Sequence, residues 1–392
     1  MSDLFPAFKK LDQQSEQYIK DRNEFFFDAN HQKAKRTYTK SETQADLNVT
    51  GPTLDKYVKS CGINPKQFDE SAWCITIDQL FQLREHMPLA KRKAKKFVRG
   101  DKKLQVIPIQ NQKGGVGKTI LSTTLASGLA TEFYQNYRVG LIDLDGQATA
   151  SMYYVDEFGD FLSAGDLITN RYKLKEGQTK QQLISSAFQE TPIPNLRILA
   201  AAQRDRGVDT WIHQSMTKGD LKDPYTLVSD IIANVEDEFD IIIIDTSPSM
   251  QFTTVNAYMA ATSIIFPIGA TENDIDATAG FFQYISSLGD LLQSRGHKGF
   301  DFTKLLLTNY RDDPAAVEAR AKLDNYYDDL LYSTEFRHSA AIRHCSAMLS
   351  TIFDISKSEY PRTKLTFQKA VDNAFAVINR IHTDIDKVWR NQ

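Results

Sequence analysis

The sequence predicts an α/β fold, in which a parallel β-sheet has helices on both faces and is preceded by an α-helical N-terminal domain. Beyond residue 104, short apolar runs alternate with helical patterns to the end of the chain. Runs such as "FDIIIID" (239–245) show no alternation of polar and apolar residues, which is typical of parallel strands buried on both faces. The length of 392 residues is enough for a large core and a second domain.

The expected elements of the sheet alternate along the chain. Strands are expected at 104–110, 138–145, 195–201, 239–245, 262–268 and 302–310. Helices are expected at 119–133, 224–235 and 276–293. Ligands of such sheets bind beyond the carboxyl ends of the strands, so the residues that follow each strand are the candidates for a site.

The segment "IQNQKGGVGKTILS" (109–122) joins the first expected strand to the first expected helix. Gly117, Lys118 and Thr119 occupy the last three places of the phosphate-loop pattern G-x-x-x-x-G-K-[ST], and Gln112 stands where its first glycine would be. Backbone N–H groups and the helix N-terminus make such a turn an anion site. The spacing does not fit the dinucleotide pattern G-x-G-x-x-G, so the loop predicts nucleotide binding through the phosphates.

The composition is typical of a soluble globular protein, with 41% hydrophobic and 25% charged residues. Its three cysteines form no C-x-x-C pair, so neither a zinc site nor a disulfide framework is predicted, and we expect a cytoplasmic protein with reduced thiols. The N-terminus lacks the apolar core of a signal peptide. The longest apolar stretch, 257–270, is too short to span a bilayer.

The charge is divided unevenly along the chain. Residues 31–103 contain 16 Lys and Arg against 8 Asp and Glu, whereas the whole chain has a net charge of −3. A basic segment joined to an acidic body suggests an appended anion-binding module, with nucleic acid as the commonest partner. The alternative is a solvated linker, because the basic residues are densest in "LAKRKAKKFVRGDKK" (89–103).

Three motifs, in order, resemble those of the ParA/MinD family of ATPases. "KGGVGKT" (113–119) resembles the family's deviant Walker A motif, and "LIDLDGQATAS" (141–151) resembles its D-x-D-P-Q segment. "FDIIIIDTSPS" (239–249) resembles its Walker B strand and the switch that follows. The resemblance covers residues 104 to about 390. It implies a P-loop NTPase fold and Mg²⁺-dependent hydrolysis of ATP to ADP.

The resemblance assigns different tasks to the two lysines of the loop. Lys118 would bind the β- and γ-phosphates of the ATP in its own subunit. Lys113, the family's signature lysine, would reach across a dimer interface to the ATP of the partner subunit, much as an arginine finger does in phosphoryl transfer. Asp145 matches the family carboxylate that positions the attacking water. These three are the candidate catalytic residues.

The resemblance also implies a metal site. Thr119 would coordinate Mg²⁺ through its hydroxyl, Asp245 would hold the water shell of the metal, and Asp143 would support that network. Asn309 matches a position that often contacts adenine. For Asp143 and Asp145 the alternative is ordinary solvation at a strand end. The other candidate nucleotide contacts are Gly114, Gly115, Val116, Gly117 and Ile120.

Two residues depart from the family pattern. Gly146 replaces the proline of D-x-D-P-Q, so the loop after Asp145 is expected to be looser. Ile120 replaces the usual Thr or Ser and removes a hydroxyl that would contact the α-phosphate. Both changes are expected to weaken nucleotide binding or slow hydrolysis, but neither removes a catalytic group.

The N-terminal third carries the patterns that distinguish members of the family. Residues 1–35 predict a long helix, which in the larger plasmid-type members pairs two subunits. Residues 36–103 predict a winged-helix or helix-turn-helix DNA-binding domain and a basic linker, with two short helices around a turn at 49–51 and an amphipathic helix at 76–87. The alternative is a generic helical bundle. The candidate DNA contacts here are Thr50, Thr53 and Lys56.

Residues 104–392 would form the ATPase domain, and its last part is expected to contact DNA. In the family, basic residues of this region bind DNA without sequence preference. No motif fixes which of them do so here, and the alternative for several is a solvated face. The helix expected at 365–389 carries aspartates on its polar face, whereas a membrane anchor would need lysines there, so we expect it to pack on the core. The candidate DNA contacts within 336–364 are Arg337, Arg343 and Lys357.

These patterns predict a ParA-type partition ATPase. Its ATP-bound form would be a dimer, or a polymer, on nonspecific DNA, and a ParB-like partner at a plasmid or chromosome centromere would stimulate hydrolysis and release it. The protein would be cytoplasmic and nucleoid-associated, would also bind a specific operator, and is not expected to bind membranes. Two alternatives stay open: a nucleotide-sensing repressor of its own operon, and a MinD-like membrane-cycling ATPase.

Overall fold

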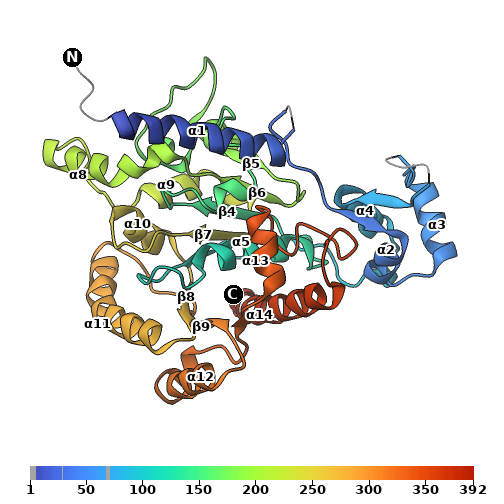
Figure 1. Ribbon diagram of the computed structural model, residues 1–392. Helices are drawn as coiled ribbons and strands as arrows, with labels where there is room; N and C mark the ends of the chain where they lie inside the picture. Colours follow the sequence, from blue (N-terminus) through green and yellow to red (C-terminus); the bar gives the residue numbers. More distant parts are fainter. Residues whose placement is uncertain (1–5, 29, 68–70) are drawn as a thin grey trace.

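An eight-stranded β-sheet forms the centre of the computed structural model, which describes residues 6–28, 30–67 and 71–392. The strand order is β10-β9-β8-β3-β7-β4-β6-β5 (Figure 1). The strands are β3 (Gln105–Ile109), β4 (Val139–Asp143), β5 (Phe188–Glu190), β6 (Leu196–Leu199), β7 (Ile241–Asp245), β8 (Ile264–Gly269), β9 (Thr303–Tyr310) and β10 (Phe336–Arg337).

The six predicted strands are all present, and they pair in parallel. The central strands β3, β4 and β7 are buried along their whole length, as their uninterrupted apolar sequences indicate. One edge differs from the prediction, because β5 pairs antiparallel with β6 and makes the sheet mixed. β5 was not predicted because it is three residues long and only Phe188 in it is buried.

Helices cover both faces of the sheet, which confirms the predicted fold class. On one face α5, α13 and α14 pack on strand residues such as Ile107, Leu141 and Ile243. On the other face α6 to α9 cover β4 and β6, while α10 to α12 cover β8 and β9. The helices are α5 (Lys118–Thr131), α6 (Ala164–Ile168), α7 (Lys180–Ala187), α8 (Val208–Lys218), α9 (Leu227–Ala233), α10 (Phe252–Ala260), α11 (Glu272–Ser294), α12 (Pro314–Tyr327), α13 (Ala340–Ala347) and α14 (Lys364–Arg390).

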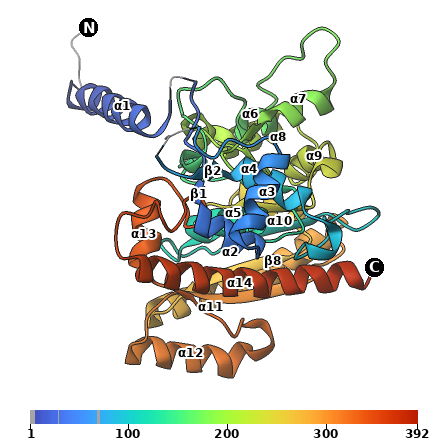
Figure 2. The same ribbon diagram turned by 90° about the vertical axis from the view of Figure 1, so that its right-hand side faces the viewer.

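The C-terminal helix α14 packs on the core, as expected from its sequence. It runs beside α5, and Ile378, Ile381 and Ile385 are buried (Figure 2). An added Cβ at Gly128 of α5 would collide with the side chains of Ile378 and Phe353, so this glycine permits the close approach of the two helices.

The N-terminal part contains the three short helices that the sequence predicts. A three-residue turn joins α2 to α3, and capping boxes at Thr39 and Thr76 start α2 and α4. An antiparallel two-stranded ribbon of β1 and β2, absent from the prediction, ties the first of these helices to the last. The elements are β1 (Thr37–Thr39), α2 (Lys40–Leu47), α3 (Gly51–Ser60), β2 (Cys74–Thr76) and α4 (Ile77–His86).

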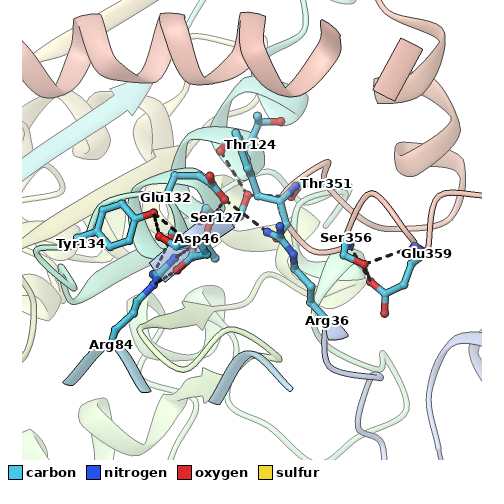
Figure 3. A network of polar contacts seen from close by, with 12 residues as sticks. Arg36, Asp46, Arg84, Thr124, Ser127, Glu132, Tyr134, Thr351, Ser356 and Glu359 are labelled. Carbon is cyan, nitrogen blue, oxygen red and sulfur yellow. Dashed lines mark hydrogen bonds and ion pairs between the residues drawn. The ribbon is translucent and has the colours of Figure 1, made fainter. Parts of the chain in front are cut away.

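A buried polar network fastens this N-terminal part to the end of α5 (Figure 3). The guanidinium of Arg84 makes two hydrogen bonds to Asp46, at 2.9 and 2.5 Å, and donates a third to the carbonyl of Thr131 in α5 at 2.9 Å. Arg36 pairs with Glu132 at 3.4 Å. Apolar residues of α2 to α4 also belong to the same buried cluster as α5 and α14, so the N-terminal part and the sheet share one core.

The long helix predicted near the N-terminus is α1 (Pro6–Phe26), and its C-terminal end and the segment after it lie against the sheet domain. Asn23 donates to Asp156 at 2.7 Å, and Lys33 donates to the carbonyl of Tyr153 at 3.0 Å. Most of α1 is exposed (Figure 1). The described part of the chain contains no helix that is long and apolar enough to cross a membrane.

Candidate nucleotide-binding site

The glycine-rich loop lies where β3 ends and α5 begins, at the carboxyl edge of the sheet. Gly115 and Gly117 have φ angles of 79° and 85°, which a residue with a Cβ rarely adopts. A Cβ built on Gly114, Gly115 or Gly117 would meet no atom within 4 Å. The loop therefore leaves open space beside the N-terminus of α5, as a phosphate cradle requires.

The two lysines of the loop occupy different environments. Lys118 is buried, 7% exposed, and its ammonium group donates to the carbonyl of Lys113 at 3.2 Å. Burial lowers the pKa of Lys118, and the negative charges of Asp245 and Asp145 partly oppose this by raising it. The side chain of Lys113 is 39% exposed and lies 3.9 Å from Asp274. Lys118 therefore lies within the cradle, whereas Lys113 lies at its rim.

Asp245, at the end of β7, is held by two hydroxyl groups of α5. Thr119 donates to its Oδ2 and Ser122 to its Oδ1, both at 2.8 Å. Burial raises the pKa of Asp245, and the two hydrogen bonds oppose that rise. Sequence reasoning named Thr119 and Asp245 but missed Ser122, although its position one helical turn after Lys118 places it on the same face of α5.

Asp143, at the end of β4, lies beside Asp245 in the register of the sheet. One of its oxygens accepts from the backbone of Asp145, and the other accepts from the N–H and hydroxyl of Ser151. Burial raises the pKa of Asp143, and the charge of Asp245 adds to the rise. Asp143 thus shapes the loop that carries Asp145, a task that the sequence did not reveal.

Gly146 follows Asp145 in that loop and lies against Arg206. A Cβ at Gly146 would come within 3.2 Å of the backbone of Arg206. The Arg206 guanidinium also donates to the carbonyl of Gly146 and to the side chain of Gln147, both at 3.3 Å. The glycine in place of proline was expected to loosen this loop. In the structure, Arg206 of the 3₁₀ helix at Gln203–Gly207 makes these two hydrogen bonds to the loop.

The end of β9 supports the phosphate loop from the other side. Asn309, with φ of 54°, donates to the carbonyl of Gly115 at 3.2 Å, and Thr308 donates to that of Val116 at 2.8 Å. The structure therefore brings Asn309 to the phosphate loop through a contact with the loop itself, and its contact with adenine stays a prediction. Ile120 is partly buried against the core.

The donors at this edge fit a magnesium ion bound together with a nucleotide. Thr119 and Asp245 present hard oxygen ligands beside Lys118, and two buried carboxylates lie together at the sheet edge. Among the described residues, no group of three or more His, Cys, Asp and Glu side chains could hold a metal. A magnesium ion here would therefore take most of its ligands from phosphate and water.

The candidate DNA contacts lie on separate surfaces. Thr50, directly before α3, and Lys56, in the middle of α3, are exposed, and the hydroxyls of Thr50 and Thr53 are 3.1 Å apart. Arg343 is exposed on α13 and Lys357 in the loop that follows, whereas Arg337 pairs with Asp312 at 2.5 Å.

The basic segment 89–103 is largely engaged within the molecule. Arg99 is 8% exposed and donates to the carbonyl of Glu236 at 2.9 Å. Lys103 pairs with Asp301 at 2.9 Å. Arg92, Lys93 and Lys96 also donate to nearby acceptors. Lys93, Arg99 and Lys103 therefore connect this segment to the sheet domain, whereas Arg92 and Lys96 bond within the N-terminal part.

A phosphate loop before a buried helix, with carboxylates at neighbouring strand ends, defines a P-loop nucleoside triphosphatase. A family model described as an AAA domain matches residues 104–295. A ParA family protein of Chlamydia pneumoniae is 30% identical over 192 residues, which cover 47% of this chain and 67% of the relative. The chain belongs to the ParA family.

Some relatives match nearly the whole chain. A putative replication protein A of Sinorhizobium fredii is 26% identical over 377 residues, which cover 93% of this chain and 89% of the relative. The similarity therefore includes the N-terminal third.

Two solved structures show the same fold. A partition protein covers 98% of each chain with a TM-score of 0.67 at 15% identity. Cobyrinic acid a,c-diamide synthase of Mycobacterium smegmatis, with a bound ATP analogue and magnesium, has a TM-score of 0.50 at 20% identity and covers 63% of this chain and 91% of its own.

Proposed function

We propose that this protein is a DNA-partition ATPase that binds ATP with Mg²⁺, assembles on DNA as an ATP-dependent dimer or polymer, and leaves it after hydrolysis to ADP. A ParB-like protein bound to the centromere of a plasmid or chromosome would stimulate hydrolysis. The protein would act in the cytoplasm on the nucleoid. Membership of the ParA family and the likeness to a partition protein support this proposal.

The separation of the two lysines carries the proposal. Lys118 lies inside the cradle beside Asp245, where it can bind the phosphates of its own ATP. Lys113 is half-exposed at the rim and has only a weak ion pair, at 3.9 Å, with Asp274. An exposed lysine at the rim of one site can neutralise the charge of the triphosphate bound in a second subunit, so bound ATP would stabilise the dimer.

Two DNA-binding surfaces belong to the proposal. The start of α3, with Thr50, Thr53 and Lys56, would read an operator as part of a helix-turn-helix. Arg343 and Lys357 would bind duplex DNA of any sequence in the ATP state. Arg337 is a weaker candidate because Asp312 already neutralises its charge. The exposed helix α1 would pair two subunits.

A repressor of its own operon is the second candidate function, and the exposed N-terminus of α3 favours it. A repressor and a partition ATPase can be the same molecule in different nucleotide states. The MinD-like alternative has less support, because the apolar face of α14 is buried against α5.

Fluorescence anisotropy on operator and random duplex, with ATP, ADP or no nucleotide, tests the proposal. Removal of the N-terminal part is a poor test, because Phe97 stacks on Trp389 and the two parts share a core. We therefore expect Thr53→Ala with Lys56→Ala to abolish the preference for operator and leave ATP-dependent binding to random DNA.

Arg343→Ala with Lys357→Ala should do the reverse, and the log–log salt slope should fall by about 0.9 for each lost phosphate contact. A wild-type protein whose binding to random DNA is indifferent to ATP would refute the partition function.

A further inference from the structure

We propose that Ser122 is a positioning residue, which fixes the carboxylate of Asp245 for the magnesium ion that accompanies ATP. The inference rests on the proposed ATPase function and adds to it a residue outside the phosphate-loop motif. It predicts that Ser122 affects the magnesium dependence of nucleotide binding and leaves magnesium-free binding unchanged.

The contacts of Asp245 lead to this inference. Its two carboxylate oxygens each accept a hydroxyl group from α5, Oδ2 from Thr119 and Oδ1 from Ser122, at 2.8 Å in both cases. Asp245 and Ser122 have no exposed surface, so solvent cannot replace either partner. Together the two hydrogen bonds determine both the position and the rotation of the carboxylate.

The single hydroxyl proton of Ser122 lies between two acceptors. The Ser122 oxygen is 2.9 Å from the carbonyl of Lys118 and 2.8 Å from Asp245. A hydrogen bond to a charged group contributes about 1.5–3 kcal/mol, against about 0.5–1.5 kcal/mol for a neutral pair. The proton therefore goes to the carboxylate when Asp245 is ionised, which is the form that holds a cation.

Ser122 would hold Asp245 independently of the metal. The Thr119 hydroxyl would have two tasks, since its oxygen would face the magnesium ion while its proton is donated to Oδ2. Ser122 is not a candidate ligand, so its hydrogen bond to Oδ1 would be unaffected by the ion. Without the Ser122 hydroxyl, the carboxylate of Asp245 would be free to rotate. Part of the magnesium affinity would then be lost in ordering this carboxylate.

Ser127 provides a matched control on the same helix. It is also wholly buried, and its hydroxyl contacts the carbonyl of Thr123 and the hydroxyl of Thr351 at 2.8 Å. None of these atoms belongs to the nucleotide site. Ser127→Ala therefore removes a buried hydroxyl from α5 without releasing Asp245.

The experiment measures binding of a fluorescent ATP analogue to the full chain, first in EDTA and then over a magnesium titration. Ser122→Ala should raise the half-saturating magnesium concentration at least about tenfold, as loss of outer-shell partners of metal ligands does. Its affinity for the analogue in EDTA should stay within about twofold, since Lys118 and the loop are unchanged. Ser127→Ala should match the wild type in both measurements.

Ser122→Cys provides a second variant of nearly the same volume, with a much weaker donor, in case the alanine variant does not fold. The inference is overturned if both Ser122 variants keep the wild-type magnesium dependence, or if they lose affinity equally in EDTA. If the wild type itself shows no effect of magnesium on nucleotide binding, the proposed ATPase function fails instead.

Discussion

Removal of Arg84 should weaken the attachment of the N-terminal part to the sheet domain. Its guanidinium is 8% exposed, makes a two-point ion pair with Asp46, and donates to the end of α5. Truncation of one partner in a buried ion pair costs about 3–5 kcal/mol. The side chain of Asp46 is 17% exposed, so water can partly solvate its carboxylate after Arg84 is removed. We therefore expect Arg84→Ala to lower the free energy of unfolding by about 3 kcal/mol.

Thermal unfolding of the full chain measures this effect. With an unfolding entropy of about 2.1 cal/mol/K per residue, 3 kcal/mol lowers the melting temperature of a chain of this length by about 4 °C. A larger decrease would mean that the N-terminal part unfolds separately, and limited proteolysis at 87–103 would then show early cleavage. Lys40→Ala is the control, because it breaks an ion pair with Asp55 that is exposed on both sides and should cost less than about 1 kcal/mol.

A double-mutant cycle with Asp46→Ala distinguishes the ion pair from other losses. The guanidinium also lies over the rings of Phe81 and Tyr134, at 5.0 and 4.5 Å, and those contacts would be lost in either background. A coupling energy of at least about 1.5 kcal/mol is expected between Arg84 and Asp46. Additive effects, or a change in melting temperature below about 1 °C for Arg84→Ala, would refute the stabilising role of the Arg84–Asp46 ion pair.

The remaining predictions concern the site and one partly buried lysine. Asp145→Ala should leave binding of ATP with Mg²⁺ within about threefold but lower hydrolysis by about 10²-fold or more, measured by phosphate release; loss of ATP binding would contradict its assigned role. Lys118→Ala should abolish ATP binding by the monomer, whereas Lys113→Ala should spare it and lose ATP-dependent dimerisation in light scattering; equal losses of affinity would place Lys113 in its own subunit's site. Burial lowers the pKa of Lys33 from 10.5 to about 8. Between these two pH values the unfolded chain therefore binds more protons at Lys33 than the folded chain, so stability should rise from about pH 8 to about pH 10. Lys33→Met should flatten that rise in thermal melts. If the variant shows the same dependence of stability on pH as the wild type, Lys33 does not have the lowered pKa.

The sheet and the phosphate loop could be predicted because their signals are local. Strands such as "FDIIIID" (239–245) are uninterrupted apolar runs, and the lysine and glycines at 113–118 adjoin in sequence. The short edge strand β5 carries no such signal, because two of its three residues are not buried. Its pairing with β6 comes from the chain reversal at 191–195, and no hydrophobic pattern of its own indicates it.

The partners of the site residues could not be predicted, because they come from distant parts of the chain. Ser122 meets Asp245 across 123 positions, and Arg206 reaches Gly146 across 60. Gly146 shows the limit most clearly. From sequence its replacement of proline indicated a looser loop, yet the structure places the Arg206 backbone where a Cβ at Gly146 would come within 3.2 Å.

The basic segment 89–103 shows the same limit for charge. Its positive residues suggested nucleic acid or a solvated linker, but a charge count does not reveal which cations have partners within the fold. Arg99 and Lys103 bind the carbonyl of Glu236 and the carboxylate of Asp301, so they are less available to a phosphate backbone than an unpaired lysine would be. The dependence of DNA affinity on salt concentration should thus come from the exposed groups of α3 and α13 more than from this segment. Only contacts that displace counterions from DNA contribute to this dependence.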